Sequence, residues 1–136
     1  MNLGVHFFDL LIWLFGPVEE TTLHANEPTR MAGALELERA RVRWFLSVNR
    51  EDLPAAVRDA EQSAWRGFTL DGEEIEFSGG FSDLHTRVYK EAIAGRGLGI
   101  EDARPAIDLL YRIRTAEVQA PARGAAHPLV TSNNPV

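Results

Sequence analysis

The chain has 136 residues, a formal net charge of −6, a pI near 5.2 and no cysteine. This length suffices for one domain with a sizeable core, and the acidic balance argues against nucleic acid as a partner. Without cysteine the chain has no disulfide, thiolate metal site or cysteine nucleophile, and its composition agrees with a reducing compartment such as the cytoplasm. The four histidines lack a local metal-binding spacing, so no metal site is predicted.

Residues 2–15, with the sequence NLGVHFFDLLIWLF, predict a helix buried on most sides, because apolar residues surround nearly the whole turn. Gly16-Pro17 predicts where this helix ends. The run free of polar residues is only Leu10 to Phe15, whereas a membrane span needs about 20 apolar residues. A basic leader and a small-residue cleavage site are also missing, so the stretch predicts a core helix, not a membrane anchor or a signal peptide.

Three polar residues interrupt this helix at Asn2, His6 and Asp9, and their i, i+4, i+7 spacing predicts that they share one face. His6 is a candidate acid/base because imidazole titrates near neutrality. Asn2 could hold a substrate hydroxyl or carbonyl, and Asp9 could orient the ring. The alternative is that all three are hydrogen-bonded polar groups in a protein interior. The spacing alone leaves both interpretations open.

The remainder of the chain predicts alternating hairpins and helices. Apolar alternation and turn residues place the strands, Asp71-Gly72 predicts a tight two-residue turn, and caps place the helices. The expected elements are a strand over 18–26, a hairpin over 34–49 turning near 38–40, a helical piece over 50–59 capped by Asp52, strands over 64–70 and 73–78, a helix over 84–94 capped by Ser82, and a helix from about 102 or 104 to 116 opened by Pro105.

This order predicts an α+β fold, an open antiparallel sheet with helices packed on one face. The domain is expected to span residues 1–118. Residues 119–136 are rich in Ala, Pro, Gly, Ser and Asn and predict a flexible tail, loose or held by a neighbour.

A dinucleotide-binding motif is missing. The most similar stretch is Gly95-Arg96-Gly97-Leu98-Gly99, but its third glycine comes too early for GxGxxG. It also follows a helix-like stretch instead of a strand. It predicts a helix-ending loop.

The run NLGVHFFDLLIWLFG resembles a signature of the glucose-fructose oxidoreductase, inositol dehydrogenase and rhizopine-catabolism family of nicotinamide-dependent sugar dehydrogenases. The resemblance implies that His6 is the acid/base beside the reacting sugar carbon and that Asn2 contacts the substrate. Many members have Asp at the Asn2 position, and Asn2 cannot act as a second base. It also implies that this chain is the C-terminal half of a larger enzyme whose preceding domain binds most of the NAD.

Four further stretches of the sequence resemble the branch of this family that oxidises UDP-N-acetylglucosaminuronic acid at C3 for bacterial surface-polysaccharide (lipopolysaccharide, O-antigen) synthesis. They are DGEEIEFS (71–78), FSDLHT (81–86), GIEDAR (99–104) and IRTA (113–116). The implied partners are a UDP-sugar and further copies of the chain packed on the open sheet face, from which Arg41 and Arg43 are expected to project. The alternative is that both arginines are ordinary solvent-exposed strand residues.

Further substrate contacts are weaker predictions. His85 follows Gly79-Gly80 near a helix N-terminus and could help bind an anionic group, although an ordinary exposed histidine is the alternative. Arg66, Arg87 and the strand arginines are candidates for the diphosphate and uronate. The isolated fragment is expected to be inactive. The alternatives are a non-catalytic oligomerisation module and a small-molecule-binding α+β domain.

Overall fold

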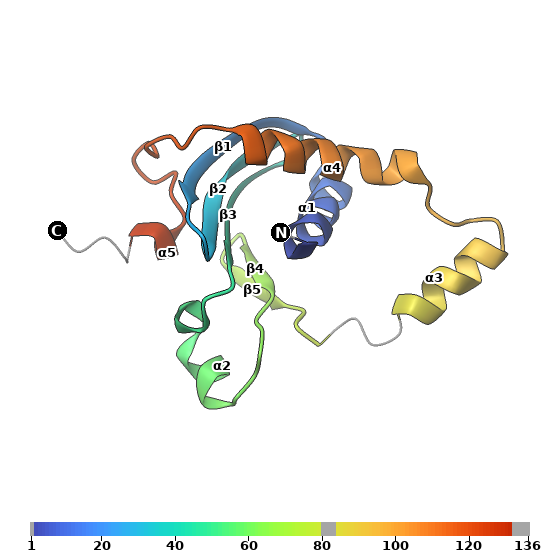
Figure 1. Cartoon of the computed structure of the whole chain (residues 1–136), viewed down its shortest axis with the longest axis horizontal. Coiled ribbons are helices and arrows are strands. Elements are labelled where there is room, and N and C mark those ends of the chain that lie inside the picture. The colour runs from blue at the N-terminus through green and yellow to red at the C-terminus, as the bar shows by residue number, and fades with distance from the viewer. Residues whose placement is uncertain (1, 80–83, 132–136) are drawn as a thin grey trace. The chain divides into compact units, whose positions relative to one another are not determined.

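The computed structural model describes residues 2–79 and 84–131 (Figure 1). Their contacts divide the chain into two compact units, one formed by residues 1–48 with 99–136 and the other by residues 49–98. The α+β class is confirmed, and the predicted elements occur in the predicted order. The structure adds a 3₁₀ turn at residues 50–52 and a short helix at residues 128–131, within the segment expected to be a flexible tail.

The first unit is built on a three-stranded antiparallel sheet of order β1-β2-β3 with two helices beside it (Figure 1). The register pairs Leu35 with Val42 and Gly33 with Trp44. Since directly opposed residues share a face, these four point to the same side. The elements are α1 (Asn2–Phe15), β1 (Val18–Asn26), β2 (Arg30–Leu37), β3 (Ala40–Ser47), α4 (Ile100–Thr115) and a short α5 (Pro128–Thr131).

One face of the sheet, called here the inner face, carries the hydrophobic core. The ring of Phe8 from α1 meets Trp44 from β3 edge-on, with centroids 5.3 Å apart, a favoured geometry for aromatic pairs. Leu109 and Ile113 bring α4 into the same cluster. The fully buried members are Phe8, Leu11, Leu23, Leu35, Trp44, Leu109 and Ile113.

The opposite face, called here the outer face, contacts the segment that follows α4. This segment begins at the edge of β1, where the amide of Gln119 donates to the carbonyl of Leu23 at 2.8 Å. It continues to β3, where His127 stacks on Phe45 with centroids 5.5 Å apart. Ala126 beside it is buried. Residues 119–127, which belong to the segment expected to be loose or held by a neighbour, therefore lie along the sheet of their own chain.

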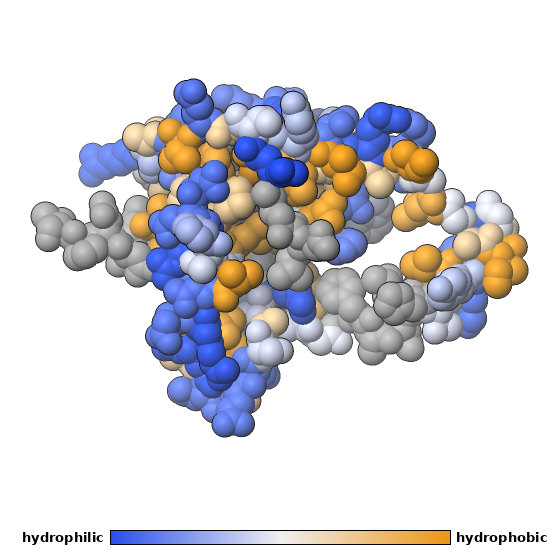
Figure 2. Space-filling model, viewed as in Figure 1, coloured by the Kyte–Doolittle hydropathy of each residue, from blue (hydrophilic) through white to orange (hydrophobic). Residues whose placement is uncertain are grey.

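The second unit holds η1 (Arg50–Asp52), α2 (Ala55–Asp59), the hairpin β4 (Gly67–Leu70) and β5 (Glu73–Glu76), and α3 (Leu84–Ile93). Its described side chains are much more exposed than those of the sheet unit. Val88, Tyr89 and Ile93 of α3 all lie at the surface, and Figure 2 shows apolar surface over α3. The hairpin turn is as predicted, since Asp71 and Gly72 both have positive φ.

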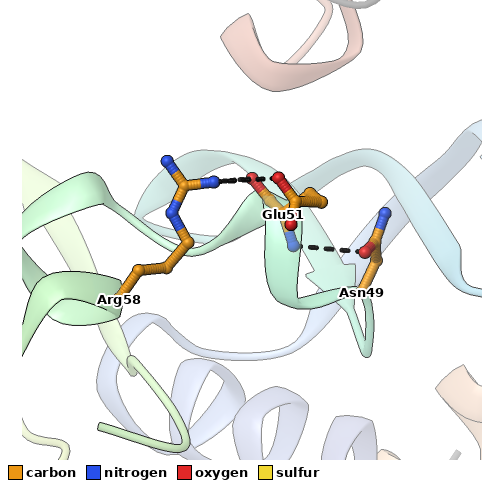
Figure 3. Close-up of polar contacts among 3 residues, drawn as sticks. All are labelled: Asn49, Glu51 and Arg58. Atoms are coloured by element: carbon orange, nitrogen blue, oxygen red, sulfur yellow. Dashed lines mark hydrogen bonds and ion pairs between the residues drawn. The ribbon is translucent and has the colours of Figure 1, made fainter. Parts of the chain in front are cut away.

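A side-chain cap begins η1, although not the one predicted. The Asn49 side chain accepts a hydrogen bond from the Glu51 amide at 3.1 Å, and Arg58 of α2 donates to a Glu51 carboxylate oxygen at 3.1 Å (Figure 3). Asp52 lies inside the 3₁₀ turn and does not cap α2, whose N-cap is Pro54. The prediction for Asp52 was wrong because the 3₁₀ turn starts before it.

Several further boundaries differ from the sequence-based ones, three of them at the starts of elements. β2 begins at Arg30 instead of 34, because its first residues pair with the end of β3. β4 begins at Gly67 instead of 64. α4 begins at Ile100, one turn before Pro105, because Asp102 accepts a hydrogen bond from the amide of the N-cap Gly99 at 2.6 Å. The predicted cap Ser82 lies outside the described residues.

Candidate active-site helix

The candidate site is the exposed face of α1, and the end of this helix is fixed as the sequence predicts. Gly16 has φ +87°, and its amide donates to the carbonyl of Ile12 at 2.9 Å. This is a left-handed helix end of the kind that glycine favours. Phe8 and Leu11 of α1 are buried in the core. This packing determines which side of the helix faces away from the sheet.

The predicted polar residues lie on that opposite side. His6 and Asp9 are both exposed, and neither makes a hydrogen bond or ion pair with another described residue. The interpretation of these two as enclosed, satisfied polar groups was therefore wrong. An accessible imidazole is what an acid/base role requires, since the ring must reach a substrate proton.

Sequence reasoning missed one member of this face. Trp13 follows Asp9 by four residues and thus continues the line of His6 and Asp9 along the helix. Its side chain is 78% exposed, an unusual position for a large aromatic ring. The signal was the same spacing that brought the polar residues together. It was overlooked because an apolar residue in a hydrophobic helix was assigned to the core.

The other predicted site residues are placed less completely. The side chains of Asn2 and His85 lie outside the described part of the structure, so their roles stay predictions. Arg41 and Arg43 project from the outer face, as predicted, and the sheet separates them from α1. Within this chain they therefore lie on the other side of the sheet from His6. The cationic substrate contacts expected from Arg66, Arg87 and the strand arginines stay predictions.

The glycine-rich text ends a helix, as predicted. The amide of Gly95 donates to the carbonyl of Ala92 at 3.1 Å, and that of Arg96 donates to Glu91 at 2.9 Å. These two bonds and the positive φ of Gly95 form a Schellman motif. Gly99 is the N-cap of α4, where Glu101 and Asp102 already place negative charge. A pyrophosphate cradle is therefore not built at residues 95–99.

The described residues contain neither a membrane-spanning helix nor a cluster of metal-binding side chains. None of their helices combines the length and the apolar character needed to cross a bilayer. Within residues 2–79 and 84–131, His, Asp and Glu side chains do not gather in threes as a metal site would require.

The fold of the described residues is similar to one part of a larger dehydrogenase, as the sequence resemblance predicts. No protein-family model matches the chain. Two solved structures are similar to it, both of the WlbA (WbpB) dehydrogenase from Thermus thermophilus. One, in complex with NAD and α-ketoglutarate, is 47% identical with a TM-score of 0.89. The other, in complex with NAD and UDP-GlcNAcA, is 46% identical with a TM-score of 0.88.

The similarity covers 94% of this chain but 41% of each of those chains. The chain thus spans about two fifths of the length of the dehydrogenase that it matches. The predicted resemblance to a UDP-N-acetylglucosaminuronate dehydrogenase is confirmed at the level of fold and sequence.

Proposed function

We propose that the chain is the substrate-facing part of an NAD-dependent dehydrogenase that oxidises C3 of UDP-N-acetylglucosaminuronic acid. The observation that supports this most is the near-half identity, over 94% of the chain, with a dehydrogenase solved with NAD and with UDP-GlcNAcA. In a bacterium the product would serve lipopolysaccharide or O-antigen synthesis, and the cysteine-free chain would work in the cytoplasm.

In this proposal His6 takes the proton of the sugar 3-hydroxyl. Its exposure on α1 supports the role, because a base must come within hydrogen-bond reach of the proton it removes. Asn2, one turn earlier, would hold a neighbouring hydroxyl or carbonyl, and His85 would help bind an anionic group of the substrate. NAD, held by the part of the enzyme outside this chain, supplies the hydride acceptor.

The exposed face of α1 would meet that other part of the enzyme. Trp13 supports this, because its ring is 78% exposed and covering it with a partner surface would be favourable. Self-association is also part of the proposal and would use the outer face of the sheet.

The decisive experiment uses the complete enzyme, with UDP-N-acetylglucosaminuronic acid and NAD as substrates and NAD reduction as the readout. His6→Ala should lower kcat by about 10²–10⁴-fold, the usual contribution of a general base. His127→Asn, which changes a histidine on the other side of the sheet, is the matched control and should keep kcat. Full turnover by His6→Ala would instead support a non-catalytic assembly role.

The 136-residue chain by itself is expected to reduce no NAD and to bind it negligibly, because the described residues lack a cradle for the pyrophosphate. Calorimetric titration of the purified chain with NAD tests this directly. Saturable NAD binding by the chain alone would contradict the proposal that NAD is held by the part of the enzyme outside this chain.

A further inference from the structure

A second candidate site lies on the outer face of the sheet, away from α1. A pocket of about 370 Å³ opens between β2, β3 and the segment after α4. Its volume is at the lower end of the range for small-molecule sites. The charged residues that line it are Glu36, Arg41, Arg43 and Arg123, and Gly124 and Ala125 form the wall opposite the strands.

The strand register explains why the charges converge. Glu36 faces Arg41 across β2 and β3, and Ala34 faces Arg43. Directly opposed residues share one side of a sheet, so both arginines emerge on the outer face. The small Ala34 leaves space between them. Arg123 approaches the same space from the segment that crosses this face.

Most of the guanidinium donors in the pocket are uncommitted. Arg41 uses Nε to bind Glu36 at 2.8 Å, and Arg43 uses Nη1 to reach the carbonyls of Gly124 and Ala126 at 3.3 and 3.4 Å. Arg123 forms no hydrogen bond or ion pair with another described residue. Each guanidinium carries five N–H donors, so the pocket keeps several for a ligand. Three arginines against one glutamate make it positive, although the chain as a whole is negative.

The charge of Arg43 also affects a neighbouring histidine. His127 stacks on Phe45 beside the pocket. Burial, and to a lesser degree the positive charge of Arg43, lower the pKa of its imidazole. The positive charge of Arg43 therefore also acts on a side chain in the contact between the segment and the sheet.

We propose that this pocket binds a small multivalent oxyanion of the phosphate class, which bridges Arg41 and Arg43 of the sheet to Arg123 of the C-terminal segment. Guanidinium groups suit this chemistry because their planar forks match phosphate and carboxylate oxygens. The bound anion would add charge-assisted bonds to a wall now held by two long hydrogen bonds. It would therefore tighten residues 123–127 on the outer face.

The test titrates the 136-residue chain with inorganic phosphate and with pyrophosphate at constant ionic strength, against chloride. A saturable rise in Tm is expected, together with slower amide exchange at Gly124 and Ala125. Arg123→Gln and Arg41→Gln should each weaken binding about tenfold or more, as expected for loss of a charge-assisted contact. Arg114→Gln makes the same charge change at an exposed position of α4 and should respond to phosphate like the parent chain.

Two results would overturn the proposal. The first is a Tm that rises no more with phosphate than with chloride, or a response that Arg123→Gln and Arg114→Gln share. The second comes from sedimentation of the same variants. If Arg123→Gln and Arg41→Gln reduce self-association and leave phosphate binding unchanged, the arginines bind carboxylates of a second copy instead of a free anion.

Discussion

At the scale of single residues, the closest approach in the sheet is at Gly33. A Cβ there would overlap the carbonyl oxygen of Thr22 and lie 2.8 Å from Cζ2 of the buried Trp44. The indole of Trp44, opposite Gly33 in the register, therefore needs a residue without a side chain beneath it. Neither the backbone of β1 nor a ring packed against Phe8 can easily move away.

Gly33→Ala is accordingly expected to lower the free energy of unfolding by about 1–3 kcal/mol, the usual cost of overpacking a core. Urea denaturation followed by tryptophan fluorescence measures this change. Gly79→Ala is the control, because its Cβ would meet nothing within 4 Å, and it should change stability by less than about 0.5 kcal/mol. Equal effects of the two substitutions would contradict the packing argument.

Two histidines of the sheet unit are expected to make stability depend on pH. Burial lowers the pKa of His24, whose Nδ1 has no hydrogen-bond partner among the described residues. Burial and Arg43 lower the pKa of His127. In the unfolded chain both titrate near 6.5. The unfolded state thus takes up protons first as the pH falls, and protonation favours unfolding.

The free energy of unfolding should therefore be level above about pH 7.5 and fall as the pH drops through about 6.5 towards the lowered native pKa values. Denaturation midpoints across this window measure the slope. His24→Gln and His127→Gln should each flatten it, whatever they do to stability at high pH. An unchanged slope in both variants would assign the pH dependence to other groups.

At the scale of elements, α4 carries an avoidable defect. Pro105 lies in its second turn, where an ordinary residue would donate its amide to the carbonyl of Glu101. The helix begins earlier than Pro105 because Asp102 caps Gly99. Packing of Ala106, Leu109 and Ile113 on the core then stabilises the turns that follow.

Pro105→Ala should restore the missing bond and raise the free energy of unfolding by about 1–2 kcal/mol. The gain in helix propensity exceeds the entropy that proline removes from the unfolded chain. Thermal unfolding followed by circular dichroism at 222 nm tests this. Pro54→Ala, at the N-cap of α2 where a helical bond is not lost, should leave Tm nearly unchanged.

How far the sequence predicts each element depends on where its stabilising contacts come from. α1 and β1 were predicted to the residue because local signals, Gly16-Pro17 and the alternation before Glu27, mark their ends. The start of β2 was missed because Arg30 and Met31 become a strand only by pairing with Ser47 and Leu46 of β3. Propensity and pattern do not record such pairing.

At the scale of the whole molecule, the same distinction separates the two faces of the sheet. The inner face and the histidine helix follow from periodicity and from the motif around His6. The outer face does not, since residues 118–127 have a composition typical of loose chain and contact the sheet only through distant partners such as Phe45 and Arg43. The arginine pocket depends on those contacts, so sequence reasoning could place Arg41 and Arg43 but not their neighbour Arg123.

The two units also predict an uneven distribution of stability. β2 is paired on both sides, and Leu35 is buried in the core, whereas Val88 and Ile93 of α3 are 56% and 87% exposed. A helix of this length is marginal in water without tertiary packing, since isolated helices need about 12–15 residues. Its ordered C-terminal end at Gly95 does not replace a buried apolar face.

Hydrogen exchange of the 136-residue chain should therefore show two classes of amides. Those of β2 and β3 should exchange only by global unfolding, while those of α3 should exchange through local opening with a much smaller free energy. Varying the protein concentration supplies the control, because protection of α3 that increases with concentration would mean that a second copy covers Val88 and Ile93. Concentration-independent protection of α3 equal to that of β2 would contradict the expectation that this helix is stabilised only locally.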